Sequence, residues 1–111
     1  MLRAGKNVLC EKTLATDTRE SNLLVKLAGE CKRAGGVAYN LRYYPLCQQA
    51  KAMVASGAIG FPRLVHGSFL QDWLLRPTDW NWRLEPKLGG ELRAVSDIGT
   101  HGMDLVTWIE G

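Results

Sequence analysis

The chain has 111 residues, of which 46% are hydrophobic and 23% are charged, a composition typical of one soluble globular domain and unlike that of a disordered chain. The net charge of +3 is mild and the basic residues are scattered, which argues against a nucleic-acid-binding tail or a basic membrane patch. The apolar runs are too short to cross a membrane, and the first residues lack the apolar centre of a signal peptide. We therefore expect a cytoplasmic protein that binds neither nucleic acid nor membrane.

The first predicted elements are a strand and a helix. Residues 8–10 have the composition of a short buried strand, and polar residues follow it. Asp17, with Glu20 three residues further on, forms a capping-box pattern before a run of apolar residues at helical spacing. The glycine pair in the sequence AGG, at 34–36, is expected to stop this helix because glycine tolerates the left-handed conformation of a C-cap.

The rest of the chain continues the alternation of strands and helices. Residues 37–44 are rich in β-forming side chains and predict a second strand, and Pro45 suits the first turn of a second helix. The remaining predicted elements are a turn over 56–62, a strand over 63–73, a long loop over 74–90 and a helix over roughly 97–110. The order β-α-β-α-β-loop-α predicts an α/β architecture with some parallel pairing.

The three cysteines are far apart and form neither a C-x-x-C pair nor a zinc-binding spacing. We therefore expect Cys10, Cys31 and Cys47 to be free thiols in a reducing compartment, and we expect no metal site.

The last predicted helix carries polar side chains in line. Asp97, His101, Asp104 and Trp108 follow one another at spacings that stack side chains along one face of a helix. One interpretation is a solvated polar face with Asp97 as the helix cap. Another is a proton-transfer pair, since histidine titrates near neutral pH and a carboxylate can orient it. A metal pair is a third interpretation, although no third ligand is evident.

Cationic and aromatic side chains occur at other candidate positions. Lys12 follows the end of a predicted strand, where open α/β sheets bind ligands, although a lone lysine there is also a common surface residue. Arg42 likewise follows strand residues, and the alternative is a surface arginine lying over a tyrosine. The long loop is rich in tryptophan and arginine, so it covers either a site or a satellite hydrophobic cluster. These loop residues are Trp73, Arg76, Trp80, Trp82 and Arg83.

Taken together, four segments resemble one protein family. They are GKNVLCEKTLA (5–15), YNLRYYP (39–45), SGAIGFPRLVHGSF (56–69) and GGELRAVSDIGTHGMDL (89–105). In this order they are similar to the glucose–fructose oxidoreductase / inositol dehydrogenase (Gfo/Idh/MocA) family of NAD(P)-dependent oxidoreductases. The resemblance covers essentially the whole chain. The pair of motifs G-K-x-V-x-x-E-K and D-x-G-x-H-x-x-D is more specific than either motif alone.

The resemblance implies a fold and an activity. The fold is α/β, with α+β character in the C-terminal part: residues 1–44 are the end of a dinucleotide-binding Rossmann domain, and residues 45–111 begin an open-sheet substrate domain. The activity is hydride transfer between NAD or NADP and a hydroxyl group of a sugar or polyol, in an enzyme expected to be a homo-oligomer.

The resemblance also implies site residues. Lys12 matches the lysine of the family's E-K-P motif, and Asp97 and His101 match its D-x-x-x-H pair, with His101 as the acid/base held in position by the carboxylate. These three are the expected catalytic residues. The expected cofactor-binding residues are Glu11, Lys12, Arg42, Trp82 and Arg83.

The sequence departs from the family pattern at two places. Thr13 stands where the family has the proline of E-K-P, and no G-x-G-x-x-G motif occurs to cradle a diphosphate. We therefore expect the chain to be the middle part of a longer enzyme. Two other functions stay open: a truncated binding or assembly module without cofactor affinity, and a hydrolase or lyase on the same scaffold.

Overall fold

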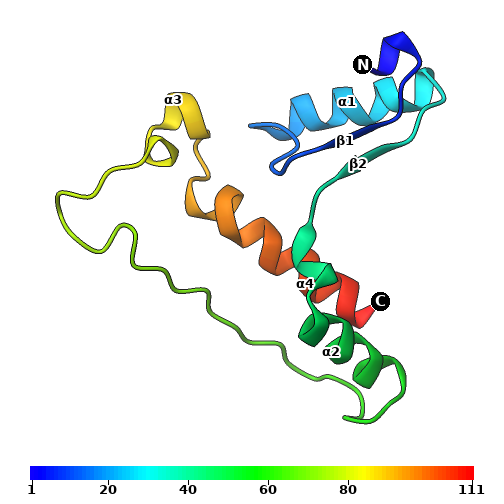
Figure 1. Cartoon of the computed structure of the whole chain (residues 1–111), viewed down its shortest axis with the longest axis vertical. Coiled ribbons are helices and arrows are strands. Elements are labelled where there is room, and N and C mark those ends of the chain that lie inside the picture. The colour runs from blue at the N-terminus through cyan, green and yellow to red at the C-terminus, as the bar shows by residue number, and fades with distance from the viewer.

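A computed structural model describes all 111 residues, and its N-terminal part is a strand–helix–strand unit. The strands β1 (Val8–Cys10) and β2 (Gly35–Val37) pair in parallel, with Cys10 opposite Val37, and the helix α1 (Thr18–Glu30) connects them (Figure 1). A short 3₁₀ helix, η1 (Leu2–Ala4), precedes β1. The predicted first strand and first helix are confirmed.

The start of α1 agrees with the sequence and its end does not. The Asp17 carboxylate accepts a hydrogen bond from the Glu20 N–H at 2.7 Å, as the capping pattern predicts. The helix ends at Glu30, before the glycines, and Lys32 adopts the left-handed conformation with φ of 51°. The expectation that the AGG segment stops the helix was wrong. Both glycines lie in β2, where a Cβ on Gly36 would come within 3.3 Å of Leu9 Cδ1 across the sheet.

The second strand is shorter than predicted. It ends at Val37, and the N–H of Tyr39 donates to the Val37 carbonyl, which bends the chain away from the sheet. The 3₁₀ helix η2 (Asn40–Tyr43) follows, so the expectation of a strand over 37–44 was wrong beyond Val37. The helix α2 (Pro45–Ala55) then begins at the proline, as predicted, and a turn follows it.

The expectation of a third strand over 63–73 was wrong. Residues 61–71 take part in no backbone–backbone hydrogen bond, and a strand exists only when a neighbour pairs with it. The segment runs as an extended arm along one side of the molecule (Figure 1, light green). The predicted loop over 74–90 is also not wholly irregular, because it contains the 3₁₀ helix η3 (Trp82–Leu84) and the one-turn helix α3 (Pro86–Gly89).

The last helix begins with a π-helical turn. The turn η4 (Val95–Gly99) continues directly into α4 (Thr100–Glu110), which confirms the predicted helix and extends it by about a half turn. The backbone N–H of Thr100 donates to the Val95 carbonyl, five residues back, in place of the α-helical partner four residues back. The apolar stripe of this helix, Ile98, Leu105 and Ile109, is half-buried.

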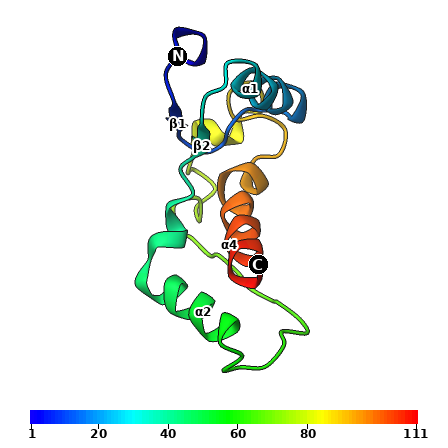
Figure 2. The ribbon, with the colours of Figure 1, turned by 90° about the vertical axis from the view of Figure 1, so that its right-hand side faces the viewer.

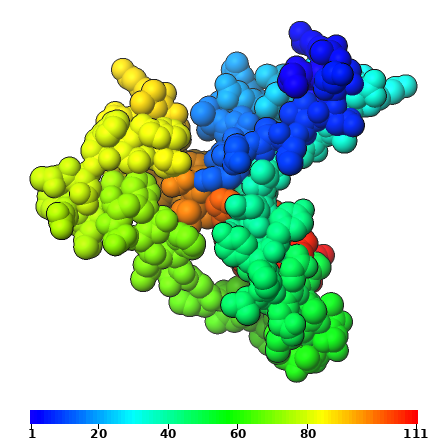
Figure 3. Space-filling view, in the orientation of Figure 1, coloured from blue at the N-terminus to red at the C-terminus, as the bar shows by residue number.

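The elements form an open arrangement without a closed core. No residue is buried, and the accessible surface is 9036 Å², against about 6100 Å² for a compact protein of this mass. The radius of gyration is 17.1 Å, against about 13 Å for a compact chain of this length. Figures 2 and 3 show why: the extended arm and α2 stand away from the strand–helix unit, and the start of α4 lies between them.

All three cysteines are free, as expected, and half-exposed. None of the helices is both long enough and apolar enough to span a bilayer. The mixture of helices with a small parallel sheet is consistent with the α/β class.

Candidate functional site

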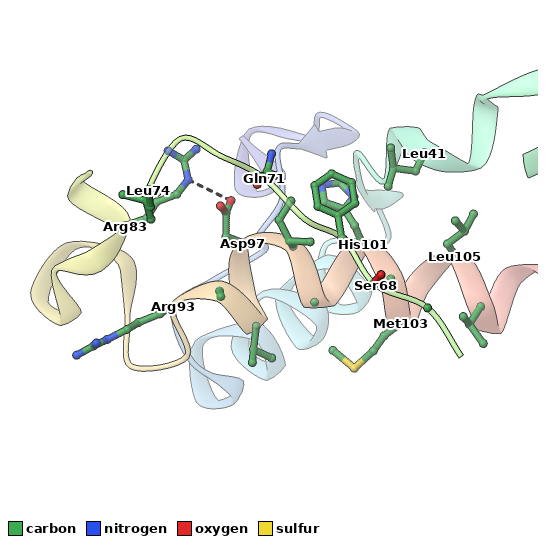
Figure 4. A pocket seen from close by; sticks show the side chains of 18 of the residues that line it. Leu41, Ser68, Gln71, Leu74, Arg83, Arg93, Asp97, His101, Met103 and Leu105 are labelled. Carbon is green, nitrogen blue, oxygen red and sulfur yellow. Dashed lines mark hydrogen bonds and ion pairs between the residues drawn. The ribbon is translucent and has the colours of Figure 1, made fainter. Parts of the chain in front are cut away.

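Two cations share one carboxylate beyond the end of β1. Lys12 Nζ lies 2.8 Å from Asp97 Oδ1 and also donates to the Asp97 backbone carbonyl, and Arg83 Nε lies 3.0 Å from the same Oδ1. The side chains of Lys12 and Asp97 are 17% and 16% exposed. Figure 4 shows the Arg83 side chain pointing toward the Asp97 carboxylate, with their contact drawn as a dashed line. We call Lys12, Asp97 and Arg83 the charge cluster.

The charge cluster keeps Asp97 ionised. Burial of the carboxylate raises its pKa, but the hydrogen bond and charge of Lys12, together with the charge and hydrogen bond of Arg83, outweigh this effect. The net result is an Asp97 pKa below the usual range. Near neutral pH the carboxylate is therefore a fixed negative charge that holds two cations, and it is a poor proton donor.

Three separate elements position the charge cluster. Lys12 follows β1, Asp97 lies in η4, and Arg83 lies in η3. The Asn81 side chain caps η3 by accepting from the Arg83 backbone N–H at 3.0 Å and also accepts from the Arg83 guanidinium at 3.3 Å. Gly89 packs closely behind, where a Cβ would lie 3.0 Å from the Arg83 carbonyl. These contacts fix the direction of the arginine.

His101 lies one helical turn beyond Asp97 and has a different neighbour from the one expected. No hydrogen bond joins the two side chains; the imidazole instead meets the Tyr39 ring edge to face, with ring centroids 5.6 Å apart. Its Nδ1 is buried and has no hydrogen-bond partner within the chain. A buried ring nitrogen without a partner is costly to leave unsatisfied. The other ring nitrogen, Nε2, is not enclosed and makes no hydrogen bond within the chain, and the histidine lines a groove beside α4.

Two adjoining cavities meet at Asp97. A groove of about 1020 Å³ lies between α4 and the extended arm, and its lining includes Asp97, His101 and Arg83. A small cavity of about 80 Å³ is lined by Lys12, Trp82, Arg83 and Asp97. In Figure 4, Asp97 and His101 point to the same side of the helix, beneath the arm that carries Gln71 and Leu74. The structure thus gathers the three expected catalytic residues around one junction.

Arg42 faces α4 and stands apart from the charge cluster. Its Nε lies 2.7 Å from Asp104 Oδ2, and its Nη2 donates to the other carboxylate oxygen. The hydrogen bond with Asp104 raises the pKa of Arg42. The guanidinium also lies 6.0 Å from the Trp108 ring, over which Lys51 is placed at 4.6 Å. A cofactor contact by Arg42 stays a prediction, and in this structure its charge is engaged by Asp104.

The other expected cofactor-binding residues divide into two groups. The Arg83 guanidinium lies 4.5 Å from the Trp82 ring, so these two join Lys12 beside the small cavity. Glu11 is exposed at the end of β1 and lines neither cavity. Trp80, in the same loop as Trp82, is 64% exposed and donates to Glu85 at 3.4 Å.

Sequence reasoning missed Tyr39 and the partner of Asp104. The register that pairs Cys10 with Val37 brings Lys12 and Tyr39 to the same sheet edge, two residues beyond paired strand positions, but no sequence pattern gives that register. The sequence predicts Tyr39 within a strand over 37–44 instead. The ion pair of Arg42 with Asp104 joins residues 62 apart in the sequence, and helical spacing carries no information about such a partner.

Comparisons with known proteins identify the class and then the family. Residues 47–111 match the model of the GFO/IDH/MocA C-terminal domain. The levoglucosan dehydrogenase of Pseudarthrobacter phenanthrenivorans is 34% identical over 109 residues, which cover 97% of this chain and 28% of that enzyme. This chain is thus related to sugar oxidoreductases, and it belongs to the Gfo/Idh/MocA family.

Solved structures agree with this assignment. The crystal structure of an oxidoreductase domain protein from Kribbella flavida superposes with a TM-score of 0.89 at 37% identity, covering 99% of this chain and 29% of that one. An inositol dehydrogenase homolog from Azotobacter vinelandii, complexed with NAD+, gives a TM-score of 0.85 at 34% identity, covering 98% of this chain and 29% of that one. The chain therefore spans less than a third of the length of these relatives.

Proposed function

We propose that this chain carries the reacting end of the active site of an NAD(P)-dependent oxidoreductase, which moves a hydride between the nicotinamide and a hydroxyl group of a sugar or polyol. The observation that carries the proposal is the charge cluster of Lys12, Asp97 and Arg83 beside the unpartnered His101. The relatedness to a levoglucosan dehydrogenase and to an NAD+-bound inositol dehydrogenase homolog supports both the cofactor and the substrate class.

His101 is the proton acceptor in this proposal. Oxidation of a hydroxyl group to a carbonyl requires that the hydroxyl proton leave as the hydride leaves carbon, and the nicotinamide supplies the hydride acceptor when it is bound. The imidazole has no hydrogen bond within the chain, and Nδ1 is enclosed, so Nε2 is the ring nitrogen that can take that proton. The Tyr39 ring, packed edge to face against it, restricts how the imidazole can turn.

Lys12 orients the reacting hydroxyl. A lysine ammonium has three N–H donors, and two of them are used by the Asp97 carboxylate and the Asp97 carbonyl. The third is available to a substrate oxygen. Asp97, held ionised, keeps the Lys12 side chain in place through these two contacts, so its role is to position the lysine and not to orient the histidine.

The residues present fit the reacting end of the cofactor better than its diphosphate. The polar cluster and the imidazole suit a carboxamide and a hydroxyl group, and Lys12, Trp82 and Arg83, which line the small cavity, would hold the reacting end of the cofactor. Cofactor contacts by Glu11 and Arg42 stay predictions, since neither lines this cavity. The 111 residues contain no G-x-G-x-x-G motif, which is the motif that would cradle the phosphates. We therefore propose that residues 1–44 form the end of the dinucleotide-binding domain and residues 45–111 the start of the substrate domain. We also propose, from the family resemblance, that the protein is a cytoplasmic homo-oligomer.

A substrate screen tests the proposed function. A protein of full family length that includes these 111 residues is incubated with NAD+ or NADP+ and a panel of anhydrosugars, aldoses and inositols, and reduced nicotinamide is followed by its absorbance. Turnover of at least one sugar or polyol is expected. Cofactor binding without any turnover would favour a lyase or hydrolase, and no binding would favour an assembly module.

A further inference from the structure

Two consecutive residues after β1 are bonded to two consecutive residues of η4. Lys12 Nζ contacts the Asp97 carboxylate at 2.8 Å, and Thr13 Oγ1 donates to the Ser96 backbone carbonyl at 2.9 Å. The two contacts join residues 85 and 83 positions apart in the sequence. The Lys12–Thr13 peptide bond is cis. The lysine contact belongs to the charge cluster, whereas the threonine contact lies beside it and involves only a hydroxyl group and a backbone carbonyl.

The Thr13 hydroxyl binds a carbonyl that the π-helical turn leaves without its α-helical partner. In an α-helix the Ser96 carbonyl would accept from the N–H of Thr100, but that N–H donates to Val95. The Ser96 carbonyl accepts instead from two hydroxyl groups, those of Thr13 at 2.9 Å and Thr100 at 3.1 Å. Single π-helical turns inside α-helices are rare and occur frequently at functional sites.

We propose that Thr13 is a positioning residue whose hydroxyl, by binding the Ser96 carbonyl, fixes the π-helical turn and so places the Asp97 carboxylate against Lys12. The inference rests on the proposed function only in that Lys12 serves the reacting hydroxyl. Thr13 itself contacts none of the reacting atoms. Asp97 is reached by Lys12 from the end of β1 and by Arg83 from η3, and loss of the Thr13 bond loosens the first of these two contacts.

A measurement that does not depend on activity tests this role. The Asp97 carboxyl carbon is followed by NMR during an acid titration, and its signal is assigned by its loss in Asp97→Asn. Thr13→Val removes the hydroxyl and keeps the branched shape, so the midpoint of the Asp97 titration is expected to rise toward that of an ordinary aspartate. Thr13→Ser keeps the hydroxyl and is expected to retain the original midpoint.

Kinetics give the second readout. Thr13→Val is expected to lower kcat about tenfold or more with little change in KM, because a slightly misplaced lysine affects the reacting geometry more than binding. Thr13→Ser is expected to restore kcat. Ser56→Ala is the matched control: it removes a hydroxyl bonded to the Met53 carbonyl at the end of α2, remote from the charge cluster, and should change neither readout.

The role of Thr13 would be refuted by an unchanged Asp97 titration in Thr13→Val, or by equal effects of valine and serine. If Thr13→Val does not fold, Thr13→Ala replaces it as the variant without a hydroxyl. An unchanged Asp97 titration in Thr13→Ala, or equal effects of alanine and serine, would then refute the role of Thr13. A wild-type protein without oxidoreductase activity would count against the proposed function, while the Asp97 titration still decides the role of Thr13.

Discussion

At the scale of single residues, the site depends on one carboxylate, that of Asp97, which forms ion pairs with two cations. Asp97 Oδ1 is within 2.8 Å of Lys12 and 3.0 Å of Arg83, and the carboxylate is mostly shielded from water. An ionised aspartate is costly to shield alone, but paired with two cations it holds parts of the chain that are far apart in sequence. The lysine, the arginine and the π-helical turn are therefore expected to respond together when Asp97 is changed.

The stability of the protein is expected to depend on pH through Asp97. Its folded-state pKa is depressed, so the unfolded chain binds the proton more readily. The contribution of Asp97 is fully present above the unfolded pKa of about 3.9 and is lost as pH falls through the lower folded value. Denaturant unfolding should show Asp97→Asn less stable than wild type at neutral pH, with the gap narrowing in acid.

Asp72→Asn is the control for this titration, since Asp72 is exposed and its side chain has no hydrogen-bond partner. It should unfold like the wild type across the whole range. A gap between Asp97→Asn and wild type that stays constant down to acid pH would show that Asp97 stabilises the fold by something other than its charge.

Removal of the imidazole is expected to separate chemistry from binding. His101→Ala should lower kcat about 10²–10⁴-fold and barely change the affinity for NAD(H), since the proposed role is proton transfer. Steady-state kinetics and a cofactor titration check both parts. His66→Ala, at the chain's second histidine, lines the same groove and should retain most of the activity. A His101→Ala enzyme with normal kcat would require another base.

At the scale of elements, one face of η4 and α4 is a row of sites for cations. Asp97 holds Lys12 and Arg83, Asp104 holds Arg42, and the Trp108 ring lies beneath Lys51. Each cation comes from a different preceding element, so this one face ties the strand–helix unit, η2 and α2 to the last helix. The aligned polar side chains are therefore neither a solvated face nor an isolated acid–histidine pair.

The Arg42–Asp104 pair should contribute measurably to this attachment. The Asp104 side chain is 12% exposed and that of Arg42 is 36% exposed, so solvent screens the arginine in part. A double-mutant cycle with Arg42→Met and Asp104→Asn is expected to give a coupling energy of about 1 kcal/mol in denaturant unfolding. The exposed Lys26–Glu30 pair, at 3.9 Å, is the control and should give about 0.3 kcal/mol or less. Equal coupling energies in the two pairs would contradict the conclusion that Arg42 attaches η2 to α4 through Asp104.

Local sequence signals predicted the local features of these elements. Asp17 and Pro45 mark helix starts correctly because capping and proline geometry act within a few residues. The partners of Asp97, Asp104 and His101 were beyond reach, because they lie on elements whose relative placement no short pattern encodes. The motif resemblance named Lys12, Asp97 and His101 together, but it suggested an Asp97–His101 contact where the geometry pairs Asp97 with Lys12.

At the scale of the whole molecule, the failed strand prediction over 63–73 has a simple cause. The segment does carry β-forming and large apolar side chains, and these are exposed, with Phe69 at 56% and Leu70 at 89%. Such a segment becomes a strand only when another strand pairs with it, and none of the 111 residues does so. The residue types of this segment favour a β-strand. In the structure, however, the backbone N–H and C=O groups of residues 61–71 have no backbone partner, so no strand forms.

The open arrangement leads to the last prediction, which concerns the behaviour of this 111-residue polypeptide in isolation. Large apolar side chains are exposed along β1, the arm and the helices, among them Leu9, Leu46, Phe61 and Leu64 at 75% or more. Exposed apolar surface and unpaired strand edges drive association. The polypeptide is therefore expected to self-associate or to unfold in a broad transition, and to bind NAD(H) only weakly because no phosphate cradle is present.

Light scattering and a thermal melt test the first part, and isothermal titration tests the second. The matched control for both is a relative of full family length, such as the NAD+-binding inositol dehydrogenase homolog, which should melt cooperatively and bind the cofactor. A monomer with a sharp transition would mean that the contacts along α4, between Lys12 and Asp97, Arg42 and Asp104, and Lys51 and Trp108, are sufficient to hold these elements together without a buried core. Micromolar affinity for NAD(H) would mean that the charge cluster binds the nicotinamide end strongly enough to dispense with the diphosphate contacts.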